Sequence, residues 1–397
     1  MRRQRSSGIS RRAFLVGGVG VLGASAIVSP PGRNLLGLSG WWLTNSTAPE
    51  VRLSVPEGVS RGAVQVTVEV GPTPSWAFVE ASIDGRPLEP GPVIAIDTRQ
   101  LKDGDHLVRL AVRDGSLRRN VRWVDAPLRS DNTPPQVVLE TKSPNGIQGR
   151  TVKLEARANE PVQLSLQQGQ NPPIYFAEEG GAYVALIGID PAAAPGSAPF
   201  KLVARDLAGN ETVLDTQIQV GRGSFLSEHI VLSADHLRFF TSGQYDLELK
   251  QLNEYYSNSG NEKLWEGSFE QPVRGVVSSG YGIDRSFNGA ERRRHLGTDF
   301  DVPVGTPIAA VARGKVVFAQ QLPVRGNAVV LDHGVGVHST YYHMSRLDVK
   351  PGDLVAKSQP LGLSGATGKV TGPHIHFEIR IAGVAVEPME WLRTRFL

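Results

Sequence analysis

The sequence has 397 residues, a formal net charge of +3 and no cysteine. Its length allows about two to four domains, and the lack of cysteine excludes disulfides, thiolate metal sites and a cysteine nucleophile. The five arginines among residues 1–32 carry the positive charge, since without them the formal net charge becomes −2. The positive charge is therefore local, and it predicts no nucleic-acid partner.

Residues 1–32 are predicted to be a signal peptide or N-terminal anchor of the twin-arginine type. The segment SRRAFL at 10–15 fits that export pattern, and an apolar, glycine-rich run extends from residue 13 to 28. This run is shorter than the roughly 20 residues of a membrane-spanning helix, and ASA at 24–26 resembles a cleavage site. Two alternative interpretations of the segment remain, an ordinary secretory signal and an uncleaved anchor. Only the uncleaved anchor would attach the protein to the membrane. Each version predicts that the rest of the chain is exported.

Two β-sandwich domains are predicted at 49–130 and 131–221, after a tether at 33–48. Alternating runs such as VQVTVEV at 64–70 and HLVRLAV at 106–112 are separated by Asp-Gly turns, which is typical of sandwich strands. The second unit ends with KLVARDLAGNET at 201–212, which resembles the closing hairpin of bacterial immunoglobulin-like modules. Neither unit contains a catalytic cluster, so both are expected to be dispensable for chemistry.

Residues 222–265 are predicted to be a helical linker. SAD at 233–235 resembles a helix N-terminus, and an apolar helix face is predicted after it. That face consists of Leu247, Leu249, Leu252, Tyr255 and Tyr256. The segment either only connects the sandwiches to the C-terminal domain or shields a groove of that domain.

The most informative motif is HIH at 374–376, with HLGTD at 295–299 upstream. Residues i and i+2 of a strand point to one face, so His374 and His376 can address the same ion. An aspartate from a neighbouring extended segment can reach that point as well. Two imidazoles and one carboxylate leave one zinc coordination position open, as catalytic sites require. Spacing alone does not say which of the two histidines binds the metal.

Residues 266–397 resemble the M23 family of zinc metallopeptidases, the lysostaphin-like and LytM-like peptidoglycan endopeptidases. The family's motifs occur in order: SSGYG at 278–282, HLGTDFDVP at 295–303, GTP at 305–307, YYHMS at 341–345, GATG at 365–368 and TGPHIHFE at 371–378. The resemblance implies an antiparallel β domain of the duplicated hybrid, or barrel-sandwich, type. The expected fold is therefore mainly β, with two tandem immunoglobulin-like sandwiches, a helical connector and this peptidase domain.

The resemblance also implies the role of each site residue. His295, Asp299 and His376 correspond to the ligands of one zinc ion, and His343 and His374 to the histidines that act on the attacking water and the transition state. Histidine suits both proton transfers because it titrates near neutral pH. The implied substrate is peptidoglycan, cut in its stem peptides or cross-bridges during cell-wall remodelling.

The sequence leaves two other functions open. One is a catalytically inactive wall-binding or scaffold protein that retains the peptidase fold, and the other is a lipoyl-like or phosphocarrier domain. His333 and His338, which flank a Gly-Val-Gly turn, are expected to take no part in chemistry. The segment between Gly282 and His295 is expected to be a loop that sets substrate specificity. The oligomeric state is not predicted.

Overall fold

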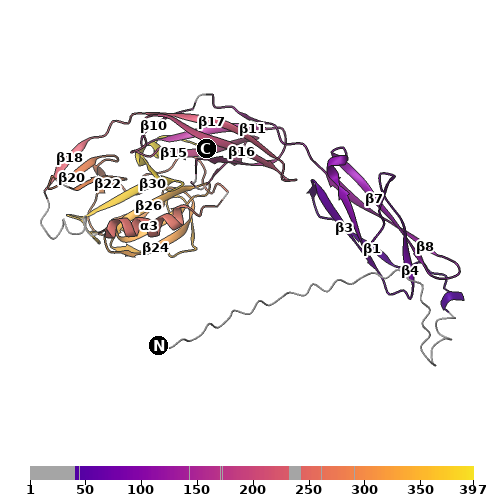
Figure 1. The fold of residues 1–397 in the computed structure, drawn as a ribbon. Helices are drawn as coiled ribbons and strands as arrows, with labels where there is room; N and C mark the ends of the chain where they lie inside the picture. The colour runs from indigo at the N-terminus through magenta and orange to yellow at the C-terminus, as the bar shows by residue number, and fades with distance from the viewer. Residues whose placement is uncertain are drawn as a thin grey trace, which may run out of the picture.

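The computed structural model describes residues 41–43, 45–142, 144–169, 171, 173–231, 243–260, 262–289 and 291–397. The predicted export segment, most of the tether and the predicted helix start at 233–235 lie outside these residues. In the described part, strands predominate and three β units follow one another along the chain (Figure 1). The prediction of a mainly β protein is confirmed. No helix of this part has the length and apolar character that crossing a membrane requires.

The first unit is a β-sandwich whose alternating residues fill one core, as half-buried strands require. Val66, Ile94 and Leu110 are fully buried between its two sheets. One sheet has the order β1 (Val51–Ser54), β3 (Ala63–Val70) and β6 (Val93–Asp97). The other has the order β2 (Val59–Ser60), β8 (Val121–Ser130), β7 (Gly104–Asp114), β4 (Trp76–Ile83) and β5 (Arg86–Leu88).

The second unit is also a two-sheet sandwich, with Leu154 and Leu202 at the centre of its core. One sheet has the order β14 (Ala177–Glu179), β15 (Ala182–Gly188), β11 (Thr151–Ala158) and β9 (Val137–Leu139). The other has the order β10 (Asn145–Ile147), β17 (Glu211–Gly221), β16 (Gly196–Asp206), β12 (Val162–Gln167) and β13 (Ile174–Tyr175). In the closing hairpin, the Nδ2 of Asn210 donates hydrogen bonds to the Asp206 carboxylate (2.8 Å) and to the carbonyl of Asp131 (3.0 Å), where the first sandwich ends.

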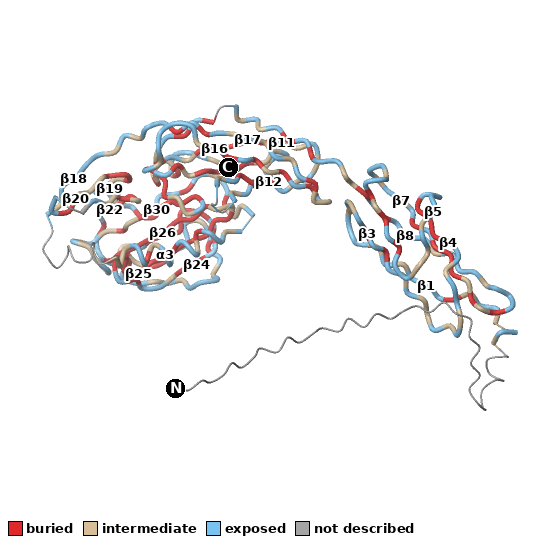
Figure 2. Tube along the Cα trace, in the orientation of Figure 1, coloured by how far each residue is buried: buried red, intermediate tan, exposed pale blue. Residues whose placement is uncertain are grey.

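The third unit contains a large antiparallel sheet that holds the histidine motifs. Its order is β19 (Val276–Ser279), β22 (Thr298–Asp301), β30 (His374–Ile381), β26 (Val337–Met344), β25 (Gly326–Asp332), β24 (Gly314–Leu322) and β28 (Leu354–Val355), with β31 (Val384–Val386) beside β30. A second sheet comprises β23 (Pro307–Ala309), β29 (Pro360–Leu363) and β27 (Arg346–Leu347). Buried residues follow β26 and β30 closely in Figure 2. These strands are therefore a rigid support for the side chains they carry.

The predicted helical linker is only partly helical. Ser227–Ile230 forms strand β18, which pairs in parallel with β20 (Asp284–Phe287), and β20 pairs with β21 (Glu291–Arg294). Helix α3 spans Gln244–Tyr256. Leu252 and Tyr256 are buried as predicted, but Leu247 is 62% exposed and Glu248 is buried in its place. The predicted helix face was wrong at this point because an ion pair, which apolar periodicity does not reveal, buries the glutamate.

The second sandwich packs directly against the third unit, and both lie apart from the first sandwich in Figure 1. Strand β15 is buried on both faces: Ala185 and Ile187 face the sandwich's own core, whereas Val184 and Leu186 belong to the core of the third unit. The short helix α4 (Pro388–Trp391) joins this contact, because the Nε1 of its last residue donates a hydrogen bond to the Oγ1 of Thr151 (3.0 Å). The two units therefore share apolar packing.

Candidate metal centre and active site

The register of two neighbouring strands brings two site residues together. In the antiparallel pair of β22 and β30, Asp299 lies directly opposite His376. Side chains that lie opposite each other on one face of such a pair are separated by only about 4.5–5.5 Å at Cβ. The expectation that the aspartate approaches from a neighbouring extended segment is confirmed.

His295 reaches the same point from the end of the β20–β21 hairpin. Its backbone continues the ladder, because its N–H donates to the carbonyl of Ile283 (2.8 Å) and its carbonyl accepts from Gly282 (2.7 Å). The chain then passes very close to the opposite strand at Gly297, where a Cβ atom would lie 2.5 Å from the Nε2 of His376. A glycine is therefore required between His295 and Asp299 in the HLGTD motif.

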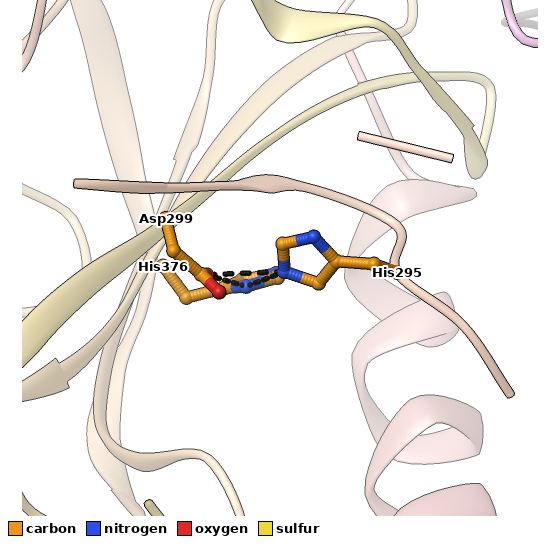
Figure 3. A group of neighbouring side chains, drawn as sticks. All are labelled: His295, Asp299 and His376. Carbon is orange, nitrogen blue, oxygen red and sulfur yellow. Dashed lines mark hydrogen bonds and ion pairs between the residues drawn. The ribbon is translucent and has the colours of Figure 1, made fainter. Parts of the chain in front are cut away.

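Three ligand atoms converge at this point (Figure 3). The Nε2 of His295 lies 3.0 Å from the Oδ1 of Asp299 and 3.0 Å from the Nδ1 of His376, and the last two atoms are 2.7 Å apart. Ligands of a tetrahedral zinc ion, with bonds of about 2.0–2.1 Å, are separated by roughly 3.3 Å. A small outward movement of the three side chains would therefore accommodate the ion, so this donor set fits zinc.

The other polar atoms of the three residues have partners that fix their orientation. The Nδ1 of His295 donates to the carbonyl of Gly280 (2.7 Å), and the Nε2 of His376 donates to Glu378 (3.0 Å). These two hydrogen bonds leave the other nitrogen of each ring facing the shared point, where it offers a lone pair to an ion once it has lost its proton. Carboxylate and carbonyl partners of this kind orient metal-binding histidines and increase their basicity.

Asp299 is held as an ionised carboxylate. Its Oδ2 accepts a hydrogen bond from Arg285 (3.3 Å). Burial opposes ionisation of Asp299, but the hydrogen bonds with His295 and His376 outweigh burial and hold its pKa well below the ordinary value. The carboxylate is therefore available as an anionic ligand at neutral pH.

His343 and His374 lie beside the three-residue cluster, with ring centroids 4.9 Å apart. The Nδ1 of His343 donates to the carbonyl of Thr367 (2.9 Å), and the Nδ1 of His374 donates to the carbonyl of Gly372 (3.0 Å). Each Nε2 therefore carries a lone pair. The Nε2 of His374 is 3.9 Å from the Oδ1 of Asp299, whereas the Nδ1 of His376 is 2.7 Å from the same oxygen.

His343 is held neutral and in an unusual backbone conformation. Burial lowers its pKa to about 3, and the neighbouring His374 and His376 add to this effect. Its φ of 64° lies in the left-handed region, which costs a residue with a side chain of order 1–3 kcal/mol and is common at functional sites. A neutral imidazole that is fixed by its Nδ1 hydrogen bond is suited to accept a proton at Nε2.

All five histidine and aspartate side chains line one pocket of about 410 Å³. Other walls of the pocket come from β18, α3 and the hairpin that precedes His295. Basic side chains are prominent among the lining residues: Arg285, Arg293, Arg294, Arg325 and Lys369. The pocket combines a potential metal centre with basic side chains, three of which form ion pairs with carboxylates of the protein.

The segment between Gly282 and His295 is not a loop but the β20–β21 hairpin, since strand β18 pairs with it and extends its ladder. His333 and His338 are fully buried away from the pocket lining, as residues without a chemical role would be. The Nδ1 of His333 donates to the carbonyl of Arg313 (2.8 Å), and the Nε2 of His338 lies 3.7 Å from the Asp332 carboxylate.

Arg285 and Glu378 support the site but were not assigned a role from the sequence. Glu378 lies two residues after His376 on the same face of β30, and its second oxygen accepts a hydrogen bond from Arg380 (2.7 Å). The period of two along a strand was the signal that could have found this glutamate. Arg285 offered no such signal, because its contact with Asp299 depends on how the hairpin folds over the sheet.

Comparison with known proteins identifies the domain that carries this site. The model of Peptidase family M23 matches residues 293–388. Two relatives from Vibrio cholerae serotype O1 are the peptidoglycan DD-endopeptidases ShyA, 38% identical over 145 residues, and ShyB, 40% identical over 151 residues. The matches cover 36% and 37% of this chain and 34% and 35% of the relatives. The chain thus spans about a third of the length of the curated relatives it matches.

A solved structure of an M23 peptidase from Pseudomonas aeruginosa is 26% identical, with a TM-score of 0.47 over 62% of this chain and 94% of that chain. The five residues that converge on the pocket, His295, Asp299, His343, His374 and His376, all lie within the range that the family model matches. The chain therefore contains a domain of peptidase family M23.

Proposed function

We propose that the chain is a zinc metalloendopeptidase that hydrolyses peptide bonds in peptidoglycan. The observation that carries this proposal is the convergence of one carboxylate and two imidazoles, within 3.0 Å of one another, beside two further histidines. A cluster of three ligands that leaves one position open is typical of catalytic zinc sites. In the proposal, His295, Asp299 and His376 hold one zinc ion, and His376 rather than His374 is the ligand.

The zinc ion, when bound, polarises the scissile carbonyl and makes water acidic enough to act as a nucleophile near neutral pH. The proton transfers and the stabilisation of the developing charge are carried out by histidine side chains of the protein. His343 is neutral and presents its Nε2 to the pocket, so it accepts the proton of the attacking water. His374, 4.9 Å away between ring centroids, is placed to stabilise the charge that develops on the substrate oxygen and to deliver a proton to the leaving amine.

Peptidoglycan is proposed as the substrate because two of the relatives are peptidoglycan DD-endopeptidases. The substrate lies outside the cytoplasmic membrane, and the twin-arginine pattern at residues 10–15 provides the matching export signal. We propose, on the same basis, that the chain acts in cell-wall remodelling after export. The two sandwiches would hold the catalytic domain at a distance from the N-terminal segment.

The test is digestion of purified sacculi by the zinc-loaded full-length chain, followed by mass spectrometry of the released muropeptides. New amino and carboxyl termini in the peptides are the expected result. The Asp299→Asn variant should release none, and His229→Gln, which changes an exposed histidine outside the pocket lining, should match the unchanged chain. Binding to sacculi without cleavage by a zinc-loaded chain would contradict the proposal and favour a wall-binding scaffold.

A further inference from the structure

Helix α3 is held to the catalytic domain in two different ways along its length. Its C-terminal half is anchored by apolar packing, since Leu252 and Tyr256 are buried in a cluster with Phe318 and Tyr342. Its N-terminal half, which lies next to the catalytic pocket, is held mainly by polar contacts of Tyr245, Asp246 and Glu248. Polar contacts exchange with competing polar ligands more readily than apolar packing does, so the two halves respond differently to a ligand.

Glu248 occupies a set of donors built to hold a carboxylate. One of its oxygens accepts a hydrogen bond from the backbone N–H of Val324 (2.6 Å). The other accepts from the backbone N–H of Arg325 (3.2 Å) and from the Nη1 of the same arginine (3.1 Å). Two backbone N–H groups and a guanidinium are the donors that carboxylates prefer. We call these groups the Arg325 cradle.

The guanidinium of Arg325 is buried but only partly satisfied. It stacks over the ring of Tyr245, 4.1 Å from the centroid, and its side chain is 3% exposed. Its Nε and Nη2 have no hydrogen-bond partner among the described residues. Because a buried cation with unused donors is costly, these two nitrogens indicate capacity for a further anionic or polar group.

The Arg325 cradle adjoins the catalytic histidine. The backbone carbonyl of Arg325 accepts a hydrogen bond from the N–H of His343 (2.9 Å). Val324, Arg325 and Tyr245 line the same pocket as the three converging ligand residues. A peptide whose carboxylate is bound in the cradle can therefore place a neighbouring peptide bond beside His343 and the three converging residues.

A second carboxylate of α3 contacts a second arginine of the pocket. Asp246 lies 3.0 Å from the Nη1 of Arg293, and Arg293 is two residues before His295. Asp246 and Glu248 therefore present two acidic groups, two residues apart, to two arginines of the pocket wall. This is the charge pattern of an acidic peptide bound across the pocket.

We propose that the Arg325 cradle is a carboxylate-binding subsite for the substrate, and that Glu248 of α3 fills it until a peptide carboxylate takes its place. The ligand is thus a peptide with a free carboxylate close to the scissile bond. The assignment rests on the proposed function, because it describes how that site selects its peptide. It also gives α3 a role, since the helix must leave the pocket wall at its N-terminal half when the substrate binds.

Replacement of the Glu248 carboxylate by a carboxylate of the substrate has a low energetic cost, because Arg325 keeps an anionic partner. Removing the partner of a buried ion pair is strongly destabilising, since the remaining charge loses its compensation. An incoming carboxylate restores the same hydrogen bonds and the same charge balance. A neutral amide of similar size restores neither, so the cradle distinguishes the two.

The test uses a matched pair of probes, acetyl-D-alanine and acetyl-D-alaninamide, and the full-length chain. Binding is measured by relaxation of the probe methyl protons, with zinc-loaded and metal-free protein compared so that binding to the ion is recognised. In Glu248→Ala the cradle is open, and acetyl-D-alanine should bind roughly ten- to a hundredfold more tightly than the amide. The same acid should bind Glu248→Ala at least about tenfold more tightly than the unchanged chain.

Glu254→Ala is the matched control, because Glu254 is an exposed glutamate on the same helix. It should bind both probes as the unchanged chain does. If Glu248→Ala does not fold, Glu248→Gln replaces it and should also bind the acid more tightly than the unchanged chain. Equal binding of acid and amide by the Glu248 variants would overturn the assignment. Preferential binding of the acid by a chain that leaves sacculi intact would overturn the proposed function only.

Discussion

The shared core between the second sandwich and the catalytic domain leads to a quantitative prediction for Leu186→Ala. Leu186 is 2% exposed and packs into the catalytic domain, although it belongs to β15 of the sandwich. Truncation of a buried leucine to alanine costs about 2–5 kcal/mol, from lost burial and the cavity that remains. We expect this loss to destabilise both units, because both contribute side chains around the cavity.

Hydrogen exchange followed by mass spectrometry measures the effect in each unit separately. Some amides exchange only when the second sandwich and the catalytic domain unfold together. They should exchange roughly 30- to 5000-fold faster in Leu186→Ala, as the expected loss of unfolding free energy implies. This increase should appear in β15 and equally in β30, which carries His374 and His376. Leu154→Ala is the control, because Leu154 is fully buried in the sandwich's own core.

Leu154→Ala removes the same atoms from the sandwich alone and should affect β30 less than Leu186→Ala does. Unchanged exchange in β30 of the Leu186→Ala variant, together with faster exchange in β15, would show that the two units unfold independently. The inference that Leu186 stabilises both units would then be refuted, and the contact between the two units would be a weak interface.

Three further predictions concern the metal, the proton transfers and acid stability. Asp299→Ala should lose most of its bound zinc at a chelator concentration that leaves the unchanged chain loaded, as metal analysis after dialysis would show; full retention would remove Asp299 from the ligand set. His343→Ala and His374→Ala should keep their zinc but cleave about 10²–10⁴-fold more slowly, and zinc loss in His374→Ala would make it a ligand instead. Burial lowers the pKa of His333 to about 4 in the folded chain. In the unfolded chain this histidine is protonated already near pH 6.5. Stability should therefore fall between about pH 6.5 and 4, by about 3 kcal/mol from this residue, and urea unfolding of His333→Asn should show a shallower fall.

The sequence predicted which residues converge in the pocket better than it predicted their surroundings. His374 and His376 follow the period of a strand, and the HLGTD motif has a fixed internal spacing, so local rules were sufficient to group them. Strand β22 then pairs with β30 in the register that places Asp299 opposite His376. The roles of the five residues remain predictions that the experiments above test.

The features that the sequence did not predict depend on contacts between distant segments. Glu248 and Arg325 are 77 positions apart, and only the folded chain shows that their ion pair buries a charged residue on the inner face of α3. The even-numbered side chains of β15 gave no sign that they pack on another unit, because a strand with two buried faces reads as an apolar run. Propensity and periodicity describe single elements, so they miss such partners.

Strand β18 has a consequence for the expression of the M23 domain as a separate fragment. This strand pairs in parallel with β20 through residues 227–230, far before the range that the family model matches. A fragment that begins near Glu266 would lack it and would present the edge of β20 to solvent, where unpaired backbone groups recruit strands from other molecules. It would also uncover the apolar surface that Val184 and Leu186 occupy. The smallest fragment that stays monomeric in concentrated solution should therefore begin before Val137, at the start of the second sandwich.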